Sequence, residues 1–285
     1  MRKENAMRVT LSLWVLVWAM PVVAGDAVPA ACASMVTKIG VPEVHGSSSA
    51  HEILCRSGYV LSHDDERKTP NWVIEHLTPA RFVGPGDRKA QGDPFKPDPD
   101  LAKGKRAELI DYKAKLKNGR KFDRGHMAPA ASMKFSKLAM TESFYLSNMA
   151  PQQGPGLNQH IWAELEGVVR DWTCDRGELY VITGPIYDGE TTDLLGPDEV
   201  AVPTAFYKIA YDPAAKRLIA FILPNERVDK KGKPVLEALK PFVMTLREVE
   251  ERAELKLFTG LSARDRRRLS TLRSVVWPIR NGCVE

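Results

Sequence analysis

The chain has 285 residues, of which 44% are hydrophobic and 27% charged, and its formal net charge is +5 at pH 7. The length allows one sizeable hydrophobic core, and the absence of internal repeats or low-complexity linkers excludes a repeat protein. So small a net charge is weak evidence for nucleic-acid binding, which the distribution of charge has to decide.

The first 24 residues have the pattern of a secretory signal peptide, with a basic start, an apolar run from Val9 to Met20 and a cleavage site after about Ala24. Met7 is an equally good start for such a signal. A membrane anchor needs about 20 apolar residues, and Pro21 and the short run argue against one. We therefore expect a periplasmic or secreted protein in which residues 25–285 form a single domain.

The four cysteines are even in number, and no two of them have the close spacing of a zinc site. In an exported chain, this favours two disulfides over free thiols. We expect Cys32 to pair with Cys55 and Cys174 with Cys283, while the sequence leaves the two other pairings open.

In the N-terminal half, residues 25–70 show no sustained hydrophobic period and predict a loop-rich lead-in. Residues 72–77 predict the first core strand. The segment 78–99 is rich in proline and glycine, which indicates an irregular surface excursion. Residues 105–116 are compatible with a short helix.

The C-terminal half predicts a central antiparallel sheet flanked by helices. Asn158 stands where a helix N-cap is expected, and apolar residues follow at helical spacing: Ile161, Leu165, Val168, Val169 and Trp172. Three runs rich in β-branched and aromatic residues predict strands: 179–182, 206–211 and 218–223. Thr245 and Glu248 form a capping-box pattern that predicts a helix through about Leu257. The fold class is therefore α+β.

The turn signal Asn118-Gly119 is expected to make a hairpin that presents Asp123-Arg124-Gly125-His126. We expect Gly125 to take a backbone conformation that other residues resist, so that Arg124 and His126 turn toward one point. An isolated motif of this kind is also compatible with a solvated ion pair at a strand end, so the residues elsewhere in the chain decide.

Those residues follow in order: the segment Ser147-Asn148-Met149-Ala150-Pro151-Gln152, then Asn158, and Glu166 eight residues later. With Asp123 to His126, this set resembles the DNA/RNA non-specific endonucleases of the ββα-metal superfamily. The resemblance spans roughly residues 55 to 260 and includes residues 72–77 and 181–185. It implies an active site built from a β-hairpin followed by a helix.

The residue chemistry suits hydrolysis of a phosphodiester bond. His126 is the expected general base, and an ordinary imidazole would make activity fall below about pH 6. Asn158 is expected to bind Mg²⁺, or Mn²⁺ in its place, through its amide oxygen, and Glu166 to hold a metal-bound water. A helix cap at Asn158 and a solvated carboxylate at Glu166 are the structural alternatives.

The remaining candidates contact phosphate or order the site. Arg124 is expected to bind phosphate and to oppose developing charge. The resemblance implies a second, upstream phosphate-binding arginine, for which Arg88 is a weak candidate because its region aligns poorly. Asn148 belongs to the catalytic set and is expected to order the loop behind His126, while Asp123 is expected to brace the hairpin.

These residues predict an exported, metal-dependent endonuclease that cleaves DNA and RNA with little sequence preference. Nine Lys or Arg against three acids between Lys103 and Arg124 support phosphate binding. The alternative is a non-catalytic exported protein that binds nucleic acid or another polyanion on the same scaffold. Expected partners are DNA and RNA, with a protein inhibitor as a further possible one and no membrane after signal cleavage. A monomer and a homodimer are both open.

Overall fold

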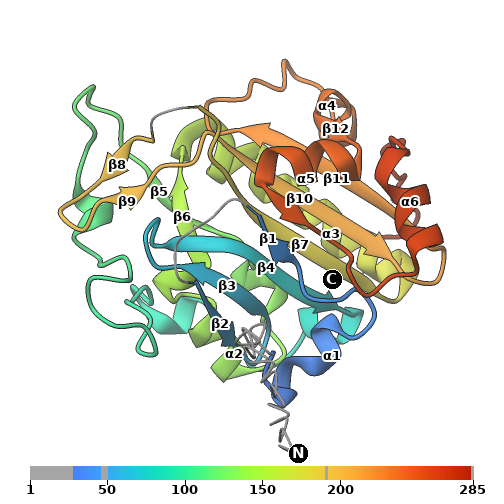
Figure 1. Ribbon diagram of the computed structural model, residues 1–285, viewed down its shortest axis with the longest axis horizontal. Helices are drawn as coiled ribbons and strands as arrows, with labels where there is room; N and C mark the ends of the chain where they lie inside the picture. Colours follow the sequence, from blue (N-terminus) through green and yellow to red (C-terminus); the bar gives the residue numbers. More distant parts are fainter. Residues whose placement is uncertain (1–27, 46–50, 190–191, 284–285) are drawn as a thin grey trace, which may run out of the picture.

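A seven-stranded antiparallel sheet forms the centre of the molecule, with strand order β12-β11-β10-β7-β4-β3-β2 (Figure 1). The computed structural model describes residues 28–45, 51–189 and 192–283, so the expected signal peptide lies outside the described residues. The strands of this sheet are β2 (His51–Cys55), β3 (Val60–Asp64), β4 (Thr69–Leu77), β7 (Leu179–Ile186), β10 (Ala205–Asp212), β11 (Arg217–Pro224) and β12 (Val243–Met244).

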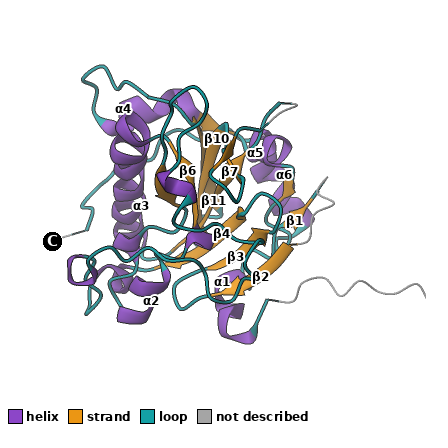
Figure 2. Cartoon of the chain, turned by 90° about the vertical axis from the view of Figure 1, so that its left-hand side faces the viewer, coloured by secondary structure: helices purple, strands orange, loops and turns teal. Residues whose placement is uncertain are grey.

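Both faces of the sheet are covered, so its long strands are buried on both sides and alternate between two hydrophobic clusters. In β10, Phe206 and Ala210 join one cluster, and Tyr207 and Ile209 join the other. The first face packs against α2 (Lys137–Glu142), α3 (Ala163–Arg176) and α4 (Val235–Leu239). The second packs against α1 (Ala33–Val36), α5 (Leu246–Ala253) and α6 (Ala263–Thr271), and Figure 2 shows the two groups of helices on opposite sides.

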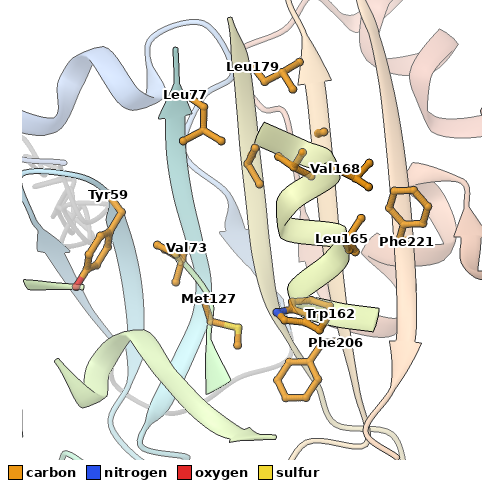
Figure 3. Packing of buried hydrophobic residues seen from close by; sticks show 14 of the residues in the cluster. Tyr59, Val73, Leu77, Met127, Trp162, Leu165, Val168, Leu179, Phe206 and Phe221 are labelled. Carbon is orange, nitrogen blue, oxygen red and sulfur yellow. The ribbon is translucent and has the colours of Figure 1, made fainter. Parts of the chain in front are cut away.

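The helix α3 lies across the middle of the first face. Leu165 and Val168 of α3 and Trp162 just before it point at the sheet, where they meet Phe206 and Phe221 (Figure 3). Trp162 is fully buried, as expected of a packing residue. This packing fixes the helix that carries Glu166 relative to the sheet.

Smaller elements surround this centre. Three two-stranded sheets pair β1 (Glu43–Val44) with β13 (Leu255–Lys256), β5 (Asp123–His126) with β6 (Met149–Gln152), and β8 (Leu194–Leu195) with β9 (Val200–Ala201). Single 3₁₀ turns occur at Ala30–Cys32, Pro79–Phe82, Lys89–Gln91, Asp111–Lys113, Ala130–Ser132, Leu146–Asn148 and Lys240–Phe242.

The α+β class, the antiparallel sheet and all four predicted core strands are confirmed, while four local predictions outside the site are wrong. The lead-in 25–70, expected to be rich in loops, contains β2 and β3. The sequence did not indicate β3 because its polar residues are buried through long-range hydrogen bonds, such as that between His63 Nε2 and Lys105 O. The expected helix over 105–116 is a single turn. The Asn118-Gly119 turn closes only locally, through Leu116 N to Arg120 O.

The fourth concerns the helix that opens at Thr245. Its capping box is present, but the helix ends at Ala253, where Glu254 takes a left-handed conformation and β13 begins. Among the described residues, no helix is long and apolar enough to span a membrane.

Two disulfides join Cys32 to Cys55 and Cys174 to Cys283, as predicted. The second ties the end of α3 to residues 272–283, which we call the C-terminal strap. The strap lies along α3: the rings of Trp277 and Trp172 are 5.2 Å apart, and Asp175 accepts hydrogen bonds from the backbone N–H groups of residues 280, 281 and 282. The helix is therefore held on one side by the sheet and on another by the strap.

Candidate active site

The motif Asp123–His126 forms β5, whose antiparallel partner is β6. Gly125 has no positive φ, so the expected unusual backbone is wrong. Its physical role is space: a Cβ there would lie 2.2 Å from Oε1 and 2.5 Å from Cβ of Gln152. Glycine thus allows the Gln152 side chain to pack against the neighbouring strand.

Asn148 is buried behind the hairpin. Its Oδ1 accepts a hydrogen bond from Ala128 N at 2.9 Å, and its Nδ2 donates to Ala128 O and Ser143 O, each at 2.9 Å. Its own backbone oxygen accepts from Met127 N. Asn148 therefore fixes the chain that follows His126 and does not line the cleft described next.

A cleft of about 1230 Å³ opens between the hairpin, α3 and the irregular segment 86–95. Six of the side chains that line it can bind phosphate, bind a cation or accept a proton: Arg88, Arg124, His126, Asn158, Glu166 and Arg170. The structure thus brings together every predicted site residue except Asn148, although Arg88 comes from the proline- and glycine-rich segment that aligned poorly.

His126 is held in a neutral state. Its Nε2 is buried and has no hydrogen-bond partner among the described residues, and its ring lies 5.1 Å from Phe144 and 5.6 Å from Phe95. Burial, with the positive charges of Arg88 and Arg124, lowers the pKa of His126 to about 3. The expected loss of activity below about pH 6 therefore does not follow from this imidazole.

Asn158 lies in the irregular helical segment Gly154–Trp162, which precedes α3. It is not the N-cap of α3, because that helix begins at Ala163 and Trp162 occupies the cap position. Asn158 Nδ2 donates to Asp123 Oδ2 at 2.8 Å, as does Gln159 Nε2. Asp123 thus braces the hairpin against this segment, and the contact commits the amide nitrogen of Asn158 and leaves its oxygen for another partner.

Glu166 lies two turns farther along, on the face of α3 that lines the cleft. Burial raises its pKa, and the positive charges of Lys208 and Arg170 oppose that rise. Lys208 is buried beneath it on β10 and donates to Thr183 Oγ1 at 2.7 Å. The carboxyl group is therefore neither a freely solvated one nor part of a closed ion pair.

Arg170 was missed by the sequence analysis. It follows Glu166 by four residues, so helical spacing places the two on one face of α3, and that spacing was the available signal. Arg170 lines the cleft, and its Nη1 is buried without a hydrogen-bond partner among the described residues. It adds a third guanidinium to the site.

Fewer of the Lys and Arg side chains in the stretch 103–124 are free to bind phosphate than its composition indicates. Lys105 pairs with Asp65 at 2.8 Å, and Arg106 pairs with Glu108 at 3.0 Å. Lys113 is exposed and lines the cleft. The charge available to a substrate therefore comes from the cleft arginines and from exposed lysines rather than from the whole stretch.

The donor set fits Mg²⁺ better than a metal bound by many protein ligands. Within the described part of the chain, no group of three His, Cys, Asp or Glu side chains is placed to hold a metal ion. Asn158 offers one amide oxygen and Glu166 one carboxylate, and Mg²⁺ commonly combines one or two such ligands with water and substrate phosphate. Asn158 and Glu166 are thus the residues that could hold the cation.

A hairpin followed by a helix, with His126 on the hairpin and Asn158 and Glu166 across the cleft, is the arrangement of a ββα-metal nuclease. The sequence matches the family described as DNA/RNA non-specific endonuclease over residues 40–264. The chain belongs to this family and is a hydrolase.

Named relatives agree with this assignment. The chain is 39% identical over 225 residues to Nuclease C1 of Cunninghamella echinulata var. echinulata, covering 75% of this chain and 85% of that protein. It is 34% identical over 232 residues to the mitochondrial endonuclease G of Homo sapiens, covering 77% and 74%. A crystal structure titled as the EndoG/EndoGI complex superposes with a TM-score of 0.71 at 31% identity, covering 84% of this chain and 96% of that one.

Proposed function

We propose that the chain is an exported, metal-dependent endonuclease that hydrolyses DNA and RNA with little sequence preference and uses His126 as its general base. The observation that carries the proposal is the imidazole of His126, whose Nε2 has no hydrogen-bond partner among the described residues and which lines one cleft with Arg88, Arg124 and Arg170. An uncommitted imidazole nitrogen can take a proton from water. Burial and the charges of Arg88 and Arg124 lower the pKa of His126, and the negative charge of a bound phosphate would offset those two charges.

In the proposed reaction, water loses a proton to His126 as its oxygen attacks phosphorus, and the bond from phosphorus to the leaving oxygen breaks. The leaving oxygen takes a proton from solvent, and His126 returns its proton to solvent, which restores the neutral base. Arg124 and Arg88 donate hydrogen bonds to the non-bridging phosphate oxygens. Asp123 holds Asn158, and Asn148 holds the chain beyond His126. Asn158 and Glu166 would hold Mg²⁺, or Mn²⁺ in its place, and the cation would supply positive charge opposite the phosphoryl and leaving oxygens.

The groups assembled in the cleft address phosphate, which every nucleotide carries, rather than base edges. We therefore expect weak base preference and cleavage of both DNA and RNA. Because each neutralised phosphate releases counterions, binding should weaken steeply with salt.

The test is to incubate the purified protein with closed circular DNA and with a structured RNA, with Mg²⁺ or with EDTA, at low and moderate salt, and to map the cut sites. The proposal expects internal cuts in both polymers only when the cation is present. Binding without cleavage would favour the non-catalytic alternative, and cuts confined to one short sequence would contradict phosphate reading.

Export and partners belong to the same proposal. Two disulfides suit an oxidising compartment, which supports a periplasmic or secreted enzyme. A protein inhibitor is included as a partner because the similar solved structure is that of the EndoG/EndoGI complex, which concerns inhibition of EndoG. A monomer and a homodimer both remain compatible with the proposal, and light scattering of the purified protein distinguishes them.

A further inference from the structure

We propose that Phe95 is a positioning residue that holds the guanidinium group of Arg124 in place for phosphate, an inference that rests on the proposed function. Phe95 belongs to no motif in the sequence. In the structure it lines the cleft, and its ring centroid lies 3.9 Å from Cζ of Arg124. This is stacking contact between an arginine and an aromatic face.

The alternative support for Arg124 is a carboxylate, and it is weak. Asp93 Oδ1 lies 3.6 Å from Arg124 Nη1, and the Asp93 side chain is 71% exposed. Exposed pairs at such distances contribute little to holding a side chain. The ring of Phe95, which is half-buried, is therefore the better shielded support.

Phe95 itself is fixed by its neighbours. Lys96 N donates to Phe144 O at 3.3 Å, and Leu146 N donates to Lys96 O at 3.0 Å, so the chain next to Phe95 is bonded to the segment that leads into Asn148. Its ring meets Phe144 edge-on, with 5.1 Å between centroids. A fixed ring can transmit its position to the arginine stacked on it.

A ring also has an electrostatic advantage over a carboxylate at this place. A carboxylate close to Arg124 would occupy the N–H groups that phosphate needs, whereas a stacked ring contacts the guanidinium face and leaves its edge free. The centroid of the same ring lies 5.6 Å from that of the His126 ring, so Phe95 stands beside both the arginine and the base. A second arginine of the cleft also lies over an aromatic ring: Cζ of Arg88 is 5.5 Å from the centroid of Phe144.

The experiment is a double-mutant cycle with Phe95→Leu, Arg124→Ala and the double variant, measured as kcat/KM on a plasmid and on an RNA. If Phe95 acts through Arg124, Phe95→Leu lowers kcat/KM by about tenfold in the wild-type background. It lowers it by less than about twofold when Arg124 is already alanine. Phe95→Tyr, which keeps the ring, should stay within about threefold of wild type.

The matched control is Phe135→Leu, which removes an arginine stack outside the cleft. There Cζ of Arg81 lies 4.5 Å from the Phe135 centroid, and the guanidinium bonds to His76 O and Gly58 O. This variant should lose stability but not kcat/KM. Phe95→Met, which keeps apolar volume without a ring, replaces the leucine variant if that one fails to fold.

Three results would overturn the inference: a Phe95→Leu enzyme within twofold of wild type, a loss that persists undiminished beside Arg124→Ala, or an equal loss in Phe135→Leu. Wild-type protein without cation-dependent cleavage would instead overturn the proposed function, which separates the two failures.

Discussion

Two buried charge clusters, one around Asp98 and one around Lys208, differ in how completely their buried carboxyl groups are hydrogen-bonded. Asp98 is fully buried, and Arg56 Nη2 donates to its two oxygens at 2.5 and 2.6 Å. Ser147 Oγ and Asp100 N donate to the same carboxylate at 2.5 and 3.0 Å. Burial would lower the pKa of Arg56, but the hydrogen bond and charge of Asp98 outweigh it and raise the pKa.

The cluster around Lys208 is incomplete. Glu75 is 1% exposed, its Oε1 has no hydrogen-bond partner among the described residues, and burial raises its pKa to about 7 against the charges of Lys208 and Arg81. Burial also lowers the pKa of Lys208, which Glu166 and Glu75 oppose. Lys208 donates a hydrogen bond to Thr183, and its single positive charge acts on two carboxyl groups, those of Glu75 and Glu166.

The difference separates structural charge from functional charge. The Asp98 carboxylate accepts four hydrogen bonds from three donor groups and so holds loops together, whereas Glu75 has an unpartnered oxygen and a raised pKa. Only the cluster around Lys208 lies beneath Glu166, and so only it bears on the cleft. The following experiments test this distinction, beginning with the largest expected effect.

His126→Ala should lower kcat/KM by about 10²- to 10⁴-fold, because it removes the group that takes the proton. Folding and nucleic-acid binding should change little, since Nε2 has no partner to lose. Thermal melting and a binding titration in EDTA are the controls. Retention of more than a few per cent of activity in the purified variant would remove His126 from the proposed role.

Arg56→Met should reduce the free energy of unfolding by about 3 to 5 kcal/mol, because it leaves the Asp98 carboxylate buried without its cation. The activity per folded molecule should be unchanged below the melting temperature. Urea unfolding and an activity assay on the same sample measure both quantities. A large loss of kcat at intact stability would mean that the Asp98 cluster is not purely structural.

Glu75→Gln should change how stability depends on pH. The pKa of Glu75 is about 7 in the folded protein and ordinarily 4.5, so the folded state binds its proton more tightly. The stability from this group is present below pH 4.5 and is lost as pH rises through 7. Relative to wild type, the glutamine variant should therefore gain stability between pH 5 and 8.5, by a few kcal/mol at most.

The measurement is urea unfolding of both proteins at the two pH values. Glu237→Gln, which removes a carboxylate with 53% of its side chain exposed, is the matched control and should differ little from wild type. A stability difference between wild type and Glu75→Gln that is independent of pH would contradict the assigned shift.

The smallest expected effect concerns His126, whose ring should not become protonated in the folded protein between pH 8 and pH 5. With a pKa of about 3, His126 should show an unchanged imidazole resonance between pH 8 and pH 5, and the spectrum of His126→Ala assigns that resonance. In urea the same ring should titrate near its ordinary pKa of about 6.5. A folded-state midpoint above pH 5 would show that burial and the neighbouring arginines do not hold the ring neutral.

Residues with a strong local signal were predictable. The β-branched and aromatic runs gave β7, β10 and β11, and the capping box at Thr245 fixed the start of α5. The order of the motif residues identified the family and most of the cleft. In each case the information lies within a few residues of the chain.

The rest depends on contacts between distant segments. The strand β5 pairs with β6, which begins 23 residues after His126. Because no tight turn joins the two strands, the local sequence does not predict this pairing. Arg88 and Phe95 belong to an irregular segment that is held by contacts with distant residues, including the Phe144 ring and backbone hydrogen bonds to Lys134 and Phe144. β3 lacks a hydrophobic signal because Ser62, His63 and Asp64 are polar, yet all three are buried. Hydrogen bonds make this possible: His63 bonds to the distant Lys105 O, and Asp64 accepts from the backbone of the turn that follows it.

The C-terminal strap has a consequence for the order of synthesis. Residues 272–283 leave the ribosome after all the other described residues, yet they supply Trp277 against Trp172 and the cysteine that closes the bridge to Cys174. Until they emerge, the outer side of α3 is exposed and untied. The outer side of the helix that carries Glu166 is therefore tied down only after the strap has been made and Cys283, 109 residues beyond Cys174, has closed the bridge.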